Sequence, residues 1–129
     1  MGQKYLIDTN VAIDYLANKL PSAAMSFMSD VVDTTPNVSV ISQIEILRYN
    51  APLYAYNVLS AFVDCAVIYP LNEEVVQATI ALCRRCRIKL PDAVIAATAI
   101  CHNLTLLTRN TSDFKYIVEL HVQNPWDLI

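Results

Sequence analysis

The chain has 129 residues, a formal net charge of −3 and 55% hydrophobic residues, which is the size and apolar content of one folded domain rather than a disordered chain. Its single glycine, Gly2, excludes a dinucleotide fingerprint and a phosphate-binding loop, because both need several glycines for close approach of the backbone. The acidic balance disfavours nucleic-acid binding by bulk charge, so any such role requires a local basic patch or metal ions.

The first expected element is a strand over residues 5–7. Tyr5, Leu6 and Ile7 are three consecutive apolar residues without alternation, which indicates a strand buried on both faces, as in a parallel sheet. The run ends abruptly at Asp8, and Asn10 follows. Ligands of open parallel sheets bind beyond the carboxyl ends of the strands, so Asp8 is a candidate site residue if other acids reach the same edge.

The remaining strands and helices alternate along the chain. Further strands are expected at residues 38–40, 65–69, 104–108 and 120–122. Helices are expected at residues 11–18, 21–32, 42–50, 52–64, 73–86, 91–103 and 110–117, with a turn at Pro36 and Asn37. Asn72 can cap the helix over residues 73–86, whose first turn is acidic. This order predicts an α/β fold with a central parallel sheet flanked by helices, in a single domain of residues 1–129. In two places the pattern gives consecutive helices, which suggests a helical hairpin.

Hydropathy indicates a cytoplasmic protein with no membrane partner. Asp14 and Lys19 interrupt the early apolar residues, so no signal peptide is expected. The longest later apolar run, residues 93–101, is too short to span a bilayer. The large apolar fraction for a domain of this size also suggests a covering partner, such as a second copy of the chain.

Four cysteines include the spaced pair Cys83 and Cys86, which could indicate a zinc or redox site. A second such pair and a nearby histidine pair are both missing, so four tetrahedral ligands are not in evidence. The pair also lies in a helical pattern. We therefore expect the cysteines to be buried, reduced thiols.

Acidic side chains stand at strand ends or helix starts in four separate segments, and each has a structural explanation. Asp8 could cap the helix that follows it. Glu45 closes the capping-box pattern that Ser42 opens. Asp92 is favoured in a first turn by the helix dipole, by about 0.3–1 kcal/mol. Asn110 could cap a helix that carries Asp113 near its third position.

The joint pattern favours a metal site over four separate caps. A parallel sheet brings these positions to one edge, and a nearby like charge raises a carboxyl pKa. The helix behind Asp92 is strongly apolar, so its N-terminus should point the acid inward. A divalent cation makes such a cluster tolerable, and oxygen ligands favour Mg²⁺ or Mn²⁺ over zinc. The usual chemistry of these sites is displacement at a phosphoryl group.

Ordered motifs in this chain resemble those of PIN-domain ribonucleases of the VapC type, the toxins of toxin–antitoxin pairs. The similar segments are LIDTNVAIDYL, VSVISQIEIL, LPDAVIAATAICHNLTLLTRNTSDF and the closing NPW, which together span nearly the whole chain. The resemblance implies a PIN-like fold and Mg²⁺- or Mn²⁺-dependent endoribonuclease activity on tRNA or rRNA. It also implies a homodimer and a VapB-type antitoxin that inserts into the site.

The resemblance also assigns roles to individual residues. Asp8 and Asp92 map onto direct metal ligands, and Glu45 onto a group that positions a water or acts as base. The fourth acidic position falls on Asp113 or on Asn110, which can offer an amide oxygen without charge. The supporting residues by the same likeness are Asn10, Ser42, Thr108 and Asn110.

Basic residues are candidates for RNA contacts. Arg48, Arg85 and Arg109 are expected at the rim of the site. Arg48 and Tyr49 depart from the family, whose members often have a small residue or glycine there, so they could narrow the groove or add a phosphate contact. For the basic run over residues 84–89 the alternative is a solvated helix end that complements the dipole.

Two other functions fit parts of the same pattern. Asp8 could be a nucleophile that carries a phosphoryl group. However, dehalogenase-like enzymes place a second Asp two residues on, where this chain has Asn10, and no receiver-type acidic pair with a suitable lysine is found. The chain could also be a non-catalytic module that binds RNA or protein, with its acids serving only as caps.

Overall fold

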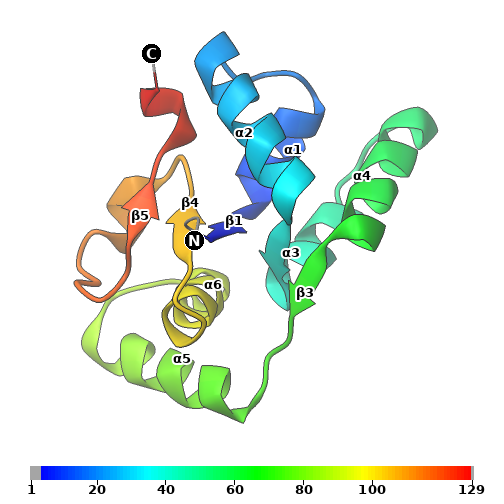
Figure 1. Ribbon diagram of the computed structural model, residues 1–129. Coiled ribbons are helices and arrows are strands. Elements are labelled where there is room, and N and C mark those ends of the chain that lie inside the picture. The colour runs from blue at the N-terminus through cyan, green and yellow to red at the C-terminus, as the bar shows by residue number, and fades with distance from the viewer. Residues whose placement is uncertain (1–3, 129) are drawn as a thin grey trace.

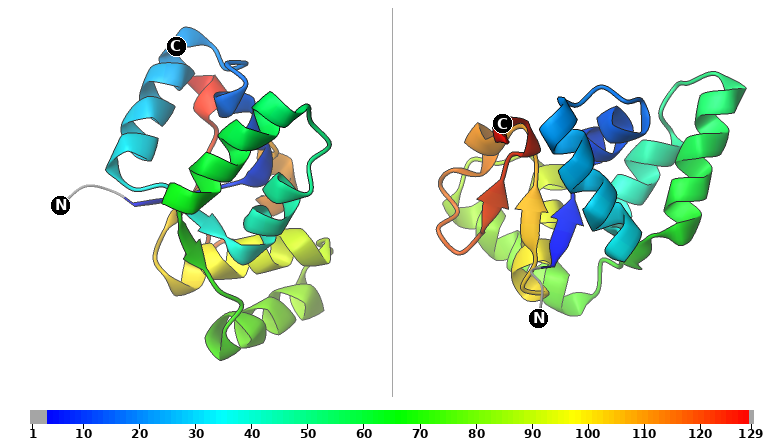
Figure 2. Two further views of the ribbon diagram at one scale, coloured as in Figure 1. Left: turned by 90° about the vertical axis from the view of Figure 1, so that its right-hand side faces the viewer. Right: turned by 45° about the horizontal axis from the view of Figure 1, so that its top comes forward.

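Parallel strand pairing organises the chain. The computed structural model describes residues 4–128, in which β1 (Tyr5–Ile7) pairs with β4 (Thr105–Leu107), and β4 pairs with β5 (Val122–Gln123). The right-hand view of Figure 2 shows these three strands side by side and pointing the same way. A second parallel ladder joins β2 (Asn37–Ser39) to β3 (Val67–Tyr69). The expected parallel α/β architecture is confirmed.

Helices cover both sides of the strands (Figure 1). They are α1 (Thr9–Leu16), α2 (Ser22–Thr34), α3 (Val40–Leu47), α4 (Leu53–Cys65), α5 (Glu73–Arg85) and α6 (Leu90–Cys101). Two 3₁₀ turns follow, η1 (Thr111–Phe114) and η2 (Pro125–Asp127). Consecutive helices occur in three places rather than the two expected, because a helix pair follows each of β1, β2 and β3.

Alternating side chains of β1 and β4 divide the core into two halves. Leu6 and Leu106 are paired in register and pack with α5 and α6, whereas Ile7 and Leu107 pack with α1 to α4. All four side chains are fully buried. Because neighbouring residues of a strand point to opposite faces, an unbroken apolar run is needed to fill both halves. The expectation of a strand buried on both faces is confirmed.

Asn37 connects the two ladders. Its buried amide Nδ2 donates a hydrogen bond to the backbone oxygen of Tyr5 at 2.9 Å. Its backbone pairs with Val67, so β2 begins at Asn37, and the expected turn at this residue is wrong. The side-chain bond holds the β2 ladder beside β1 and so brings the carboxyl ends of both strands to one side of the molecule.

The helix after β2 begins earlier than the sequence suggested. Ser39 caps α3, because its Oγ accepts a hydrogen bond from the N–H of Ile41 at 3.0 Å. Ser42 and Glu45 therefore lie inside the helix, and the predicted capping box is wrong. By contrast Asn72 caps α5 as predicted, with its side chain accepting from the N–H of Val75.

The cysteines differ from expectation in their burial. All four are free thiols, but Cys65 and Cys83 are exposed and Cys86 and Cys101 are half-buried. Cys83 is exposed because the buried positions of α5 are taken by Val75, Thr79 and Leu82. As for membranes, none of the helices that the structure describes is long and apolar enough to cross one.

Candidate active site

Asp8 lies directly beyond β1 and is hydrogen-bonded through both carboxylate oxygens. Its backbone N–H donates to Leu107 at 3.0 Å and so extends the ladder by one residue. Oδ1 accepts from the N–H of Thr9 at 2.8 Å, and Oδ2 accepts from the hydroxyl of Thr108 at 2.7 Å. Asp8 is thus the N-cap of α1, as the structural explanation predicted, and it also presents a fixed carboxylate at the strand end.

Thr108 is brought to Asp8 by the register of the sheet. Because Ile7 pairs with Leu107, the next residues on both strands are neighbours. The buried Thr108 hydroxyl also accepts from the N–H of Asn110 at 3.1 Å. The predicted supporting residue therefore orients Asp8 and fixes the start of the following loop.

Thr9 connects Asp8 to Glu45, and the sequence analysis did not identify it. Its buried hydroxyl bonds the Glu45 carboxylate, with an oxygen separation of 2.5 Å, and lies 2.9 Å from Ser42 Oγ. Glu45 therefore turns toward α1 rather than back to the start of its own helix. The one feature of the sequence that could have indicated Thr9 is its place immediately after Asp8 at a helix start.

Asp92 lies in the first turn of α6, ahead of a wholly buried segment over residues 93–99. Its side chain makes no hydrogen bond with any residue in the range 4–128, so it does not cap this helix. Burial raises the pKa of Asp92, and the negative charges of Asp8, Asp113 and Glu45 raise it further, while Lys89 opposes them.

The pKa of Asp8 is also raised, and two of the same neighbouring acids contribute. Burial raises the pKa of Asp8, and hydrogen bonds from Thr108 and Thr9 partly offset this. The charges of Glu45 and Asp113 add to the rise. Asp8, Glu45 and Asp92 line one hollow of the surface, and Asp92 and Asp113 line a second, so acids from four segments of the chain are neighbours.

Basic side chains in the described range form no ion pair with these acids, although the charge of Lys89 acts on Asp92. Within residues 4–128 the one ion pair joins Arg85 to Glu119, and neither belongs to the group of four acids. The cluster, defined here as Asp8, Glu45, Asp92 and Asp113, therefore keeps oxygen ligands without a paired cation. No three His, Cys, Asp or Glu side chains in the described range are already placed to hold one ion directly.

A hollow of about 480 Å³ opens beside three of these acids. It is lined by Asp8, Thr9, Asn10, Ile13, Glu45, Arg48, Tyr49, Asn50, Asp92 and Asn110. The hollow therefore contains two of the predicted supporting amides, Asn10 and Asn110. Asp113 lies outside its wall and lines a second hollow of about 420 Å³, which Asp92 also lines.

The three arginines predicted to contact RNA have different surroundings. Arg48 ends α3 and lines the first hollow. Arg109 lies over the ring of Trp126, 4.7 Å from its centre, and lines neither hollow. Arg85 is held by Glu119. The structure thus brings Arg48 to the acids, while other groups engage Arg85 and Arg109.

We expect Asp92→Asn to leave the metal-free protein equally or more stable to heat. The change removes a charge that burial and three other carboxylates disfavour, while keeping the size of the side chain. Because folding raises the pKa above 3.8, the folded state binds more protons than the unfolded state above that pH. The ionised Asp92 therefore lowers stability as pH rises, and the gain in Tm should grow from about pH 4 to about pH 7.

Thermal unfolding in chelator, with Asp64→Asn as the control, measures this effect. Asp64 is exposed on α4 and lines neither hollow, so its substitution should change Tm little at any pH. A marked loss of stability in Asp92→Asn alone would instead show that the acid has a structural capping role.

Comparison with known proteins shows which family the chain is similar to. A PIN domain match covers residues 5–120. The chain is 34% identical over 92 residues to a Rickettsia bellii protein named Ribonuclease VapC, a match that covers 71% of this chain and 61% of that relative. The chain therefore spans less than two thirds of the length of this curated relative.

Solved structures agree on the fold. A toxin–antitoxin complex from Klebsiella pneumoniae contains a chain with 26% identity and a TM-score of 0.75, over 97% of this chain and 100% of that one. The VapBC2 complex of Rickettsia felis, solved with a promoter DNA fragment, gives 21% identity and a TM-score of 0.79, over 95% and 98%. At 21% identity, the likeness to the Rickettsia felis complex shows a shared fold and nothing more. From the match over residues 5–120, the chain belongs to the PIN domain family.

Proposed function

We propose that this protein is a metal-dependent endoribonuclease and the toxin of a type II toxin–antitoxin pair. The observation that carries the proposal is the cluster of four acids from separate segments, none of which forms an ion pair with a basic side chain in the described range. Membership of the PIN domain family supports it, as does the likeness to the protein named Ribonuclease VapC.

The ligand set suits Mg²⁺ or Mn²⁺. All the donors in the cluster are carboxylate oxygens, which hard divalent cations prefer. Mg²⁺ usually keeps several waters and is bound through one or two carboxylates. This agrees with the absence, among the described residues, of three side chains already placed on one ion. We assign direct binding to Asp8 and Asp92, with Glu45 and Asp113 acting through water.

The chain's own residues would orient the reaction. A bound divalent cation supplies positive charge for the phosphate and lowers the pKa of the attacking water. Thr108 and the N–H of Thr9 hold the Asp8 carboxylate in one orientation. The Thr9 hydroxyl holds Glu45 toward the hollow, where the carboxylate can accept a proton from water. Asn10 and Asn110 can donate hydrogen bonds to the RNA backbone from the hollow's wall.

No observation favours the two other functions. A phosphoryl-carrying Asp8 lacks its usual partner, because Asn10 stands two residues on, where dehalogenase-like enzymes place a second Asp. A module whose acids serve only as caps does not account for Asp92, which caps nothing in the described range.

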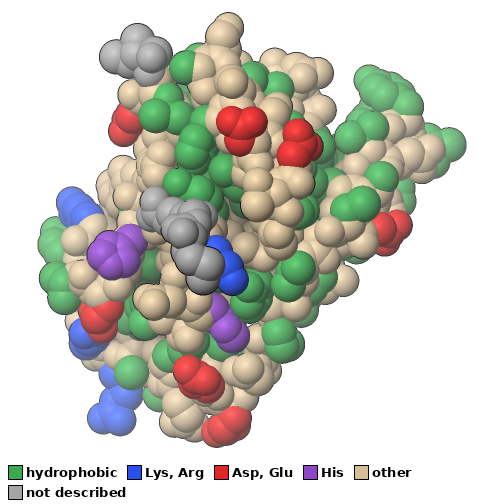
Figure 3. All heavy atoms as spheres, viewed as in Figure 1, with side chains coloured by type: hydrophobic (Ala, Val, Ile, Leu, Met, Phe, Trp, Pro, Cys, Tyr) green, Lys and Arg blue, Asp and Glu red, His purple; other side chains and the backbone are tan. Residues whose placement is uncertain are grey.

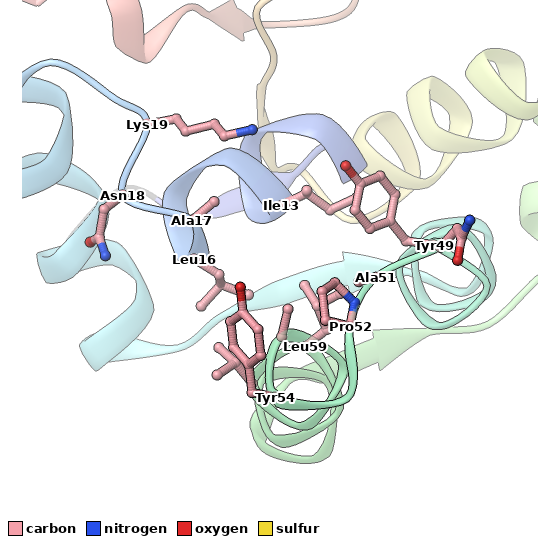
Figure 4. Close-up of a pocket in the computed structure, with 13 residues that line it drawn as sticks. Ile13, Leu16, Ala17, Asn18, Lys19, Tyr49, Ala51, Pro52, Tyr54 and Leu59 are labelled. Atoms are coloured by element: carbon pink, nitrogen blue, oxygen red, sulfur yellow. The ribbon is translucent and has the colours of Figure 1, made fainter.

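A groove next to the acids is the proposed binding site for the antitoxin. It has a volume of about 430 Å³, lies between α1 and α4, and shares Ile13, Tyr49 and Asn50 with the first hollow. Figure 4 shows Ala51 and Leu59 between Tyr49 and Tyr54, with Leu16 on the side of α1. Its outer residues, Tyr54 and Val58, are 76% and 47% exposed, and Figure 3 shows hydrophobic side chains gathered at the outer end of α4. An apolar partner segment laid here reaches the acids directly.

We also propose that the protein acts in the cytoplasm and forms a homodimer. Four free thiols, two of them exposed, suit a reducing compartment. Large apolar side chains away from the groove are exposed as well, including Leu90 at 64% and Val118 at 87%. Such side chains suit contact with a second copy.

RNA cleavage tests the proposed activity. The wild type should cut RNA from a pool of tRNA, rRNA and mixed-sequence oligonucleotides when Mg²⁺ or Mn²⁺ is present and not in chelator. Asp8→Asn should lose more than about 100-fold, because removing even an outer partner of a metal ligand costs about 10–100-fold. Asp64→Asn, a change of the same chemistry on exposed α4, should retain full activity. Equal cleavage by Asp8→Asn and the wild type would contradict the assignment.

The antitoxin site is tested with the product of the neighbouring gene, which the proposal expects to be a small partner protein. Val58→Asp places a charge in the apolar groove and should weaken binding by at least 10-fold in calorimetry, or about 1.4 kcal/mol. Asn57→Asp, on the same helix but outside the groove, should bind as the wild type does. Undiminished binding by Val58→Asp would exclude the groove.

Light scattering of the isolated chain tests the proposed homodimer, because it reports whether the chain forms a dimer before the partner is added.

A further inference from the structure

Asp92 lies between two hollows. The first, described above, also contains Asp8 and Glu45. The second, of about 420 Å³, contains Asp113 and the basic segment that joins α5 to α6. Asp92 is the residue that lines both. A ligand longer than one hollow could therefore pass across the acids and occupy both sides.

Both hollows combine an exposed tyrosine with a basic residue. In the first hollow Tyr49 is 47% exposed and stands next to Arg48. In the second Tyr116 is 76% exposed and shares the wall with Arg87 and Lys89. Lys115 Nζ lies over the Tyr116 ring, 5.1 Å from its centre, which adds a positive charge beside this hollow. A nucleic-acid base can stack on an exposed aromatic ring whatever its sequence.

Cations of the second hollow are available to a ligand. Arg87 and Lys89 form no ion pair within residues 4–128, whereas the nearby Arg85 is held by Glu119. Lys89 occupies the N-cap position of α6 without capping it, and its charge acts on Asp92. Figure 3 shows Lys and Arg side chains along the lower left of the molecule, beside the C-terminal end of α5. Arg87 and Lys89 therefore line the same hollow as Asp92, where their side chains can contact a phosphate bound next to the acids.

We propose that the second hollow is a nucleotide subsite, in which Tyr116 stacks on a base and Arg87 and Lys89 contact the adjoining phosphate. Single-stranded RNA then crosses Asp92 with one nucleotide in each hollow, and the bond to be cut lies between them. The strand must be unpaired there, because a base in a duplex cannot stack on a side chain. This inference rests on the proposed ribonuclease activity and adds the position and the single-stranded character of its substrate.

Steady-state kinetics on the shortest RNA that the wild type cuts tests the subsite. Tyr116→Ala should raise KM about 10-fold with kcat unchanged, the scale of one lost base stack. Tyr116→Phe keeps the ring and should behave as the wild type does. Arg87→Gln should raise KM and reduce the salt dependence of binding by about one unit of slope. The matched controls are Tyr56→Ala on α4 and Arg84→Gln on α5, which line neither hollow.

Removing only the base identifies the nucleotide involved, because an abasic nucleotide keeps the bond to be cut. An abasic nucleotide in the second hollow should raise the wild type's KM about 10-fold and leave that of Tyr116→Ala unchanged, because the stack is already lost. An equal further loss in the variant, or unchanged KM in Tyr116→Ala, would overturn the subsite while the ribonuclease activity stands. If the wild type cuts no RNA, the proposed function fails, and the subsite fails with it.

Discussion

Repulsion among carboxylates at one edge of a parallel sheet is the constraint on which the site depends. Burial and neighbouring charge raise the pKa of both Asp8 and Asp92, so the folded chain brings together groups that would be more stable apart. Such an arrangement persists only if the surrounding structure fixes each group. Here the register of β1 against β4 places Thr108 beside Asp8, and α1 places Thr9 beside Glu45.

Asp8 has a structural role in the fold, whereas Asp92 has none as a helix cap. Asp8 caps α1 with one oxygen while the other accepts from Thr108, so its cap also sets its orientation. Asp92 has no such bond in the described range and is opposed by burial and three like charges. The helix dipole, worth about 0.3–1 kcal/mol, offsets part of this penalty. A cation between the acids would turn the repulsion into binding free energy.

Much of the fold could be predicted because it follows local rules. The unbroken apolar run of β1 indicated two buried faces, and Asn72 ahead of an acidic turn indicated the start of α5. The start of α3 was misplaced because Ser39 and Ser42 are both plausible caps. Strand pairing with β3 decides between them, and that pairing is a tertiary contact.

The meeting of three acids at one hollow was predictable, and their hydrogen-bond partners were not. Asp8, Glu45 and Asp92 stand at positions that a parallel sheet brings together. The bond from Thr9 to Glu45 joins residues 36 positions apart, and nothing local indicates it. Arg85 and Arg109 were basic residues at suitable places along the chain, yet Glu119 and Trp126 engage them. The exposure of Cys83 likewise depends on which side of α5 faces the core.

The most direct test of this account is a Mn²⁺ titration of the partner-free protein by calorimetry. Wild type, Asp8→Asn and the exposed control Asp64→Asn are compared under the same conditions. The account predicts saturable binding to the wild type and to Asp64→Asn, and lost or much weakened binding to Asp8→Asn. No binding to the wild type, or equal binding to Asp8→Asn, would contradict the claim that the four acids form a metal site.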